Sequence, residues 1–180
     1  MNKEMLYIAV SGIIAFILTV ITSIYFNPWF NLFKNAFSDL GSDKANLPII
    51  YNYGLIITSL FVIMYSISLI SLGKNKLEVV SGSFFFIAGI FLSLIGIYHA
   101  GTRPHVFVSS YFFIQSDISI LTWSLSALSN KINYGIISLT LVLLGTILGF
   151  FLNWPSVAIQ EAFGISLISI WVIFASFYYD

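Results

Sequence analysis

The sequence contains no cysteine, only four prolines and very few charged residues. Without cysteine, the chain cannot form disulfides, perform thiol redox chemistry or hold an iron–sulfur cluster through thiolates. Charged residues make up 8% of its 180 residues, whereas a soluble domain carries about 25%. A water-facing surface cannot be built from so few charges, so we expect lipid to surround most of the chain. The net charge of zero also argues against nucleic acid as a partner, because binding it needs a basic face.

What the sequence has instead is long apolar runs. Hydrophobic residues make up 59% of the chain, and they fall into stretches about as long as a bilayer crossing. We expect six transmembrane helices, over residues 5–26, 48–72, 79–99, 106–128, 134–153 and 157–178. An open sheet would leave backbone groups unpaired in hydrocarbon, and the runs do not alternate as barrel strands would. The predicted fold is an all-α integral membrane protein, with residues 1–180 forming a single transmembrane domain.

The lysines and the arginine predict how the helices are oriented. Six spans put both ends of the chain on one side of the membrane. That side carries Lys3, Lys74, Lys76 and Lys131, and the other side carries Lys34, Lys44 and Arg103. The small excess of positive charge favours a multi-pass protein of the cell membrane with cytoplasmic termini.

The first loop has the pattern of a short amphipathic helix. Asn27 and Pro28 suit a helix start, and Gly41 suits a helix end. The aromatic and aliphatic residues that would share one face are Trp29, Phe30, Phe33, Phe37 and Leu40. Such a helix is suited to lying in the membrane surface, although a simple lid or spacer is an alternative interpretation.

Asp39 would lie at the carboxyl end of that helix, where the helix dipole disfavours an anion. The third loop, on the same side of the membrane, contains both histidines, His99 and His105, and the only arginine, Arg103. We therefore expect Arg103 to pair with Asp39 through a bidentate ion pair, with a tight turn holding the two histidines near each other.

These two loops allow several functions, among which the sequence does not choose. Asp39 and Arg103 could hold the headgroup of a membrane lipid or another polar ligand. The two histidines with Asp39 or Asp43 could bind zinc, although their six-residue separation is not a specific metal motif. Ser38 and one histidine could serve as nucleophile and base in hydrolysis or acyl transfer. The same residues could also form only a hydrogen-bonded plug between the loops.

Two acidic residues fall inside predicted spans. Asp117 lies near the middle of the fourth span, and Glu161 lies about one turn into the sixth. A lone anion at the bilayer centre costs about 3 kcal/mol or more, so each should face the protein interior or be protonated. The two could belong to a proton-coupled transporter, or each could be a neutral acid that links helices.

Small residues recur along one face of two predicted spans. They are Gly82, Gly89, Ser93, Gly96 and Ala100 in the third span, and Gly135, Ser138, Gly145 and Gly149 in the fifth. Such faces allow close helix packing, within the bundle or between copies of the chain in a homo-oligomer. A lipid-sized groove along the same faces is the alternative interpretation.

The stretch from Phe37 to Gly41, Phe-Ser-Asp-Leu-Gly, followed by Asn52 and Gly54, resembles a family of uncharacterised prokaryotic membrane proteins. This is the family catalogued as domain of unknown function 998. The resemblance covers nearly the whole chain and implies about six spans and a histidine-containing segment after the third span. His99 and His105 fit that segment.

A fainter similarity is to the DRAM-type six-span proteins of eukaryotes, which are associated with lipid remodelling, lipid distribution and autophagy. Phe37 replaces the usual aliphatic residue of that family, and Pro48 comes later than its prolines. Neither resemblance implies an agreed catalytic residue. The leading prediction is recognition of a lipid or polar headgroup at the outer leaflet, ahead of a membrane-embedded hydrolase or acyl transferase and a proton-coupled transporter.

Overall fold

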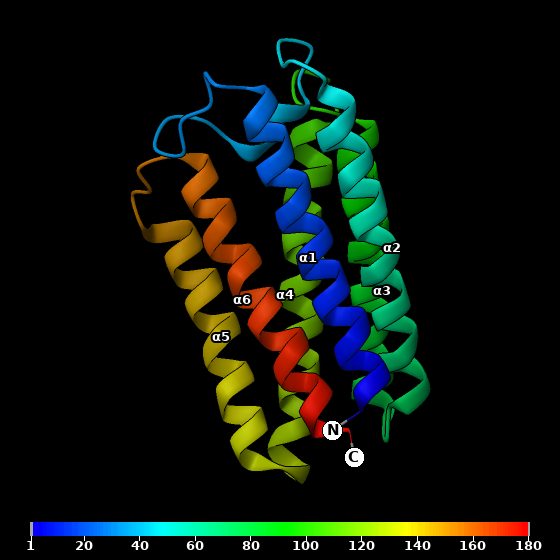
Figure 1. Cartoon of the computed structure of the whole chain (residues 1–180). Helices are drawn as coiled ribbons and strands as arrows, with labels where there is room; N and C mark the ends of the chain where they lie inside the picture. The colour runs from blue at the N-terminus through cyan, green and yellow to red at the C-terminus, as the bar shows by residue number, and fades with distance from the viewer. Residues whose placement is uncertain (1, 180) are drawn as a thin grey trace.

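The computed structural model describes residues 2–179, and the regular elements within that range are all helical. Six long helices follow one another, with a short 3-10 helix after the first. They are α1 (Lys3–Phe26), η1 (Phe37–Gly41), α2 (Pro48–Leu72), α3 (Lys76–Ile97), α4 (His105–Asn130), α5 (Ile132–Phe151) and α6 (Val157–Tyr178). Figure 1 shows the long helices side by side in one bundle, with both ends of the chain at the same end.

We call the two ends of this bundle the termini end and the loop end. At the termini end, the backbone N–H of Asn2 donates to the carbonyl of Ser176, with 3.0 Å between the two atoms. The loop end carries residues 27–47, 98–104 and 152–156, which connect the helices there. Segment 27–47 runs from α1 across to the start of α6 before it returns to α2 (Figure 1), and the N–H of Ala158 donates to the carbonyl of Asn35 at 2.9 Å.

The predicted spans agree with the observed helices to within a few residues. Five helices, α1, α2, α3, α5 and α6, are long and apolar enough to cross a membrane, so the chain is a multi-pass membrane protein. The exception is α4, which is rich in serine and also holds Gln115 and Asp117. Its serines at 116, 119, 124 and 126 are buried, so its polar face is turned toward the protein. That α4 forms a sixth span remains a prediction.

Small residues on α3 allow close contact with α2 on one side and with α4 on the other. A side chain at Gly82, Gly89 or Gly96 of α3 would overlap α2, so these glycines serve helix packing. On its other side, α3 is joined to α4 by two reciprocal hydrogen bonds. The hydroxyl of Ser81 donates to the carbonyl of Ser119 at 2.8 Å, and the hydroxyl of Ser119 donates to the carbonyl of Ser81 at 2.9 Å.

The amphipathic helix expected over residues 27–41 is not formed. Turns occupy most of residues 28–34, and only Phe37–Gly41 is helical, as the 3-10 helix η1. The expected apolar face is therefore divided. Phe37 and Leu40 are buried in the core, whereas Trp29 and Phe33 are exposed. The side-chain oxygens of Asn27 and Asn35 accept backbone N–H groups in this segment. These hydrogen bonds compete with those of a helix, so the chain turns instead.

Candidate functional site

The segment Ser38-Asp39-Leu40-Gly41 is built to fold back onto the bundle. Leu40 is completely buried. A side chain at Gly41 would overlap Asn52 and Tyr51, and the amide of Asn52 donates to the carbonyl of Gly41 at 2.9 Å. The close approach of this segment to α2 therefore requires glycine at position 41.

Asp39 lies at the opposite end of its helix from the one expected. Since η1 begins at Phe37, Asp39 is in its first turn, where the helix dipole favours an anion. Its Oδ2 accepts the backbone N–H of Ala36 at 2.9 Å. This hydrogen bond and the position of Asp39 at the helix start both stabilise the carboxylate without a cation beside it.

The predicted pair between Asp39 and Arg103 is wrong. Among residues 2–179 no ion pair joins these two side chains, and Arg103 is exposed. His99 instead approaches the first loop at Asp43, with 3.6 Å between Nε2 and Oδ1. The proposed headgroup anchor made of Asp39 and Arg103 is therefore not assembled.

The two histidines do not converge with Ser38 or with a metal ligand set. The Nδ1 of His105 is 2.8 Å from the carbonyl oxygen of Tyr98, and the Nδ1 of His99 is 3.1 Å from that of Ala100. Within the described residues no hydrogen bond joins Ser38 to a histidine, and no three acidic or histidine side chains gather as ligands. The loops thus offer neither the zinc site nor the serine–histidine pair considered from the sequence.

The two acidic residues of the predicted spans line the same cavity, which lies between α4, α5 and α6. This cavity encloses about 360 Å³, and both Asp117 and Glu161 line it. Its other polar lining residues are Ser109, Ser110, Thr146 and Gln160, and the rest of its wall is apolar or glycine. A cavity of this size, mostly apolar with a few polar groups, is typical of a small-molecule site.

Each of the two carboxylates uses one oxygen within the protein. Asp117 Oδ2 accepts the hydroxyl of Thr146 at 3.2 Å, and Glu161 Oε2 accepts the backbone N–H of Phe37 at 2.8 Å. The second oxygens, Asp117 Oδ1 and Glu161 Oε1, receive no hydrogen bond from residues 2–179. Glu161 thus links α6 to η1 and still has a free acceptor for a ligand.

Asp117 lies deeper in the bundle than Glu161. It comes twelve residues after the start of α4, and Glu161 comes four residues after the start of α6. Both helices begin at the loop end and run in the same direction (Figure 1). At 1.5 Å per residue, the backbone positions of Asp117 and Glu161 differ in depth by roughly 12 Å. The cavity is therefore elongated along the helices and occupies the half of the bundle toward the loop end.

The small residues of α5 belong partly to packing and partly to this cavity. A Cβ at Gly135 would overlap the backbone of Leu128, so α5 and α4 touch near the termini end. A Cβ at Gly149 would have no atom within 4 Å, and one at Gly145 would meet only Leu167 and Asp117. Both of these glycines line the cavity. The half of α5 near the termini end therefore packs against α4, and the half near the loop end lines the cavity.

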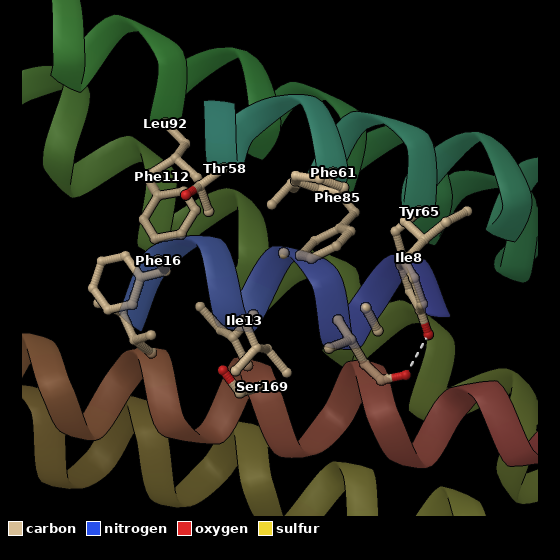
Figure 2. Close-up of a pocket in the computed structure, with 16 residues that line it drawn as sticks. Ile8, Ile13, Phe16, Thr58, Phe61, Tyr65, Phe85, Leu92, Phe112 and Ser169 are labelled. Carbon is tan, nitrogen blue, oxygen red and sulfur yellow. Dashed lines mark hydrogen bonds between the residues drawn. The ribbon is translucent and has the colours of Figure 1, made fainter. Parts of the chain in front are cut away.

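A second cavity, of about 90 Å³, lies near the centre of the bundle against α1, α2, α3, α4 and α6. Figure 2 shows its wall, to which Ile13, Phe16 and Phe61 contribute apolar side chains. Two of its polar groups are already satisfied, since Tyr65 donates to the carbonyl of Val172 at 2.6 Å and Thr58 to that of Gly54 at 2.8 Å. Its size and walls are those of a packing defect, and too small for a whole ligand.

Glu78 is an important residue that the sequence reasoning missed. It is fully buried at the termini end, where five donors surround its carboxylate. They are the N–H of Lys74, the amide of Asn75, and the hydroxyls of Ser126, Tyr178 and Tyr179. The expected span began at residue 79, which put Glu78 in the aqueous loop, but α3 begins at Lys76. No spacing in the sequence links position 78 to Tyr178 and Tyr179, so this contact could not be found without the fold.

The surroundings of Glu78 join α3, α4 and α6. Burial, with the charge of Glu78, raises the pKa of Tyr179 above its ordinary value, so its hydroxyl remains a donor at neutral pH. The hydroxyl of Tyr179 also accepts the indole N–H of Trp123 at 3.0 Å. With every carboxylate oxygen bonded, this cluster is a structural lock and offers no acceptor to a ligand.

A family described as "Protein of unknown function (DUF998)" matches residues 10–178, which is nearly the whole chain. No curated protein and no solved structure matches. The similarity to the DRAM-type proteins is therefore not shown, and the site has to be interpreted from its own chemistry.

Proposed function

The chain belongs to the DUF998 family of proteins of unknown function, and from its geometry we propose that it recognises a membrane lipid or another amphiphile in the cavity between α4, α5 and α6. The observation that carries this proposal is that Asp117 and Glu161, which come from different helices, line the same largely apolar space. The polar part of the ligand would meet these acceptors, and its apolar part would lie against the remaining wall.

The borders of the cavity support entry from the lipid. Ile114 of α4 and Phe150 of α5 line it and are exposed on the surface of the bundle. Hydrophobic side chains exposed on a membrane helix face acyl chains, so an amphiphile already in the bilayer would reach the cavity without passing through water. This route needs α4 to be a sixth membrane span, which is part of the proposal.

The proposal places the cavity in the outer leaflet. It lies toward the loop end, and the slight excess of lysines at the termini end favours cytoplasmic termini. The anchor for the polar group is Asp117 with Glu161, in place of the Asp39 and Arg103 expected from the sequence.

A variant that fills the cavity tests this function. A Cβ at Gly149 meets no neighbour within 4 Å, so Gly149→Phe should fold while occupying the space of the ligand. Native mass spectra of the detergent-purified protein should show a retained amphiphile that Gly149→Phe loses. The control is Ile147→Phe, because Ile147 lies on the same helix, is exposed and does not line the cavity. Equal retention of the bound mass by both variants would refute a site in this cavity.

Transport coupled to protons is a second candidate, favoured by the different depths of the two carboxylates. A charge that moves through the membrane needs acceptors at successive depths, and Asp117 and Glu161 lie at such positions in one cavity. In proteoliposomes, an imposed pH gradient should then drive uptake of the retained amphiphile. Asp117→Asn should abolish this uptake, and Ser38→Ala should leave it unchanged. Binding without gradient-driven uptake would refute transport, and recognition would remain as the proposed function.

A further inference from the structure

The walls of the α4–α5–α6 cavity carry charge of one sign only. Of the eighteen residues that line it, Asp117 and Glu161 are acidic and none is lysine, arginine or histidine. A low-dielectric space with carboxylates and no cation on its walls attracts a positive group and repels an anionic one. Resting on the proposed function, we infer that the ligand is a cationic amphiphile, with an ammonium group and an apolar body.

Asp117 is the better of the two anchors for the ammonium group. Its Oδ2 has only the neutral hydroxyl of Thr146 as a donor, and its Oδ1 has none among residues 2–179. The absence of a side chain at Gly145 leaves room beside that oxygen, because even a Cβ there would lie 3.9 Å from Oδ1. An ammonium N–H placed in this gap would satisfy the free oxygen and form a charge-assisted hydrogen bond.

Glu161 provides a weaker position nearer the loop end. Its Oε2 is held by the N–H of Phe37, which stabilises the carboxylate and fixes its orientation. The backbone positions of Asp117 and Glu161 differ in depth by roughly 12 Å, and their carboxylates are held by groups on different elements, Thr146 of α5 and Phe37 of η1. The two groups are therefore separate contact points for a larger molecule.

The remaining wall suits the apolar body of such a molecule. Phe113, Leu167 and Ile168 contribute apolar side chains around the depth of Asp117. An anionic lipid headgroup would find no basic partner in this wall, and a molecule without a polar group would leave the carboxylates unpaired. A cation with an aliphatic or aromatic body satisfies both parts of the wall.

The charge of the ligand can be tested with three probes of the same chain length. Decylammonium, decan-1-ol and decanoate are titrated onto the full chain in phosphatidylcholine nanodiscs, and bound probe is counted by native mass spectrometry. We expect decylammonium to bind roughly tenfold or more tightly than decan-1-ol, because a buried charged hydrogen bond is gained. Decanoate should not bind in the cavity.

Variants assign the preference to the carboxylates. Asp117→Asn should remove most of the advantage of decylammonium, Glu161→Gln should reduce it less, and the exposed Glu4→Gln should not change it. The comparison of the three probes on the unmodified chain does not depend on any variant folding. If all three probes bind alike and Gly149→Phe abolishes that binding, the proposed function stands and the cationic ligand is refuted. If Gly149→Phe changes nothing, both are refuted.

Discussion

Single residues in this protein owe their roles to the space around them more than to their chemical type. Gly41 and Gly149 are both glycines of a small, tightly connected bundle, yet one touches α2 and the other faces open space. Asp39 and Glu161 are both acidic, and both accept a backbone N–H at the start of η1. Only Glu161 also lines the cavity.

The two glycines should respond oppositely to the same substitution. Gly41→Ala should lower the free energy of unfolding by about 1–3 kcal/mol, because the added methyl group overlaps Asn52 and Tyr51. Gly149→Ala should leave the stability unchanged or raise it slightly, since alanine favours the helix and meets no neighbour. Thermal unfolding in one detergent, followed by circular dichroism, measures both. A stable Gly41→Ala variant would show that η1 does not depend on this close approach.

Among the charged residues, Glu78 should be the one whose substitution lowers the folding stability most. Glu78→Ala leaves five donors without their acceptor, and three of them, the hydroxyls of Ser126, Tyr178 and Tyr179, are buried. We expect a loss of about 3 kcal/mol or more in stability. The same unfolding assay should show no change for Glu4→Ala, because Glu4 is exposed in the first turn of α1. If both variants melt at the temperature of the unmodified chain, the termini end is not locked by this carboxylate.

At the scale of elements, the sequence predicted the helices far better than the connections. Apolar length alone located the long helices, since burial in lipid fixes both their type and their size. The helix predicted in segment 27–47 did not form, because the side chains of Asn27 and Asn35 accept backbone N–H groups there and the N–H of Phe37 donates to Glu161 of α6. Asp117 and Glu161 could be singled out as a candidate pair because a carboxylate in an apolar run is conspicuous. Its partner groups depend on the packing of three helices, which the sequence does not reveal.

The contact between η1 and α6 makes a prediction about local motion. Glu161→Ala removes the acceptor of the Phe37 N–H, so amides in residues 27–47 should exchange hydrogen faster than in the unmodified chain. Glu161→Gln retains an oxygen acceptor and should keep most of the protection. Hydrogen–deuterium exchange with mass spectrometry resolves this segment from the helices. Unchanged exchange in Glu161→Ala would mean that Leu40 and Gly41 hold the segment without α6.

At the scale of the whole molecule, the prediction of six spans depends on whether α4 crosses the membrane. The chain has no cysteine, so a single introduced cysteine can be labelled without background. Arg103 and Ser129 lie at opposite ends of α4, and both are exposed.

If α4 is a span, a membrane-impermeant maleimide should label Arg103→Cys and Ser129→Cys from opposite sides of the membrane. Lys44→Cys should behave like Arg103→Cys, and Lys76→Cys should behave like Ser129→Cys, which provides a control at each end. With cytoplasmic termini, the loop-end pair reacts in intact cells and the other pair only after permeabilisation. Labelling of Arg103→Cys and Ser129→Cys from one side would refute the sixth span.

The polarity of α4 also has a consequence for how the protein is made. Presented to the insertion machinery alone, this helix would partition poorly into lipid, because it holds Gln115 and Asp117 and because Ser119 would lack the partners that it has in the bundle. The reciprocal hydrogen bonds between Ser81 and Ser119 supply such partners from the helix synthesised just before it. We therefore expect α3 and α4 to leave the translocon together as a hairpin. Substitutions on the α3 face would then act as topology mutations, leaving α4 outside the bilayer in chains whose other helices are correctly inserted.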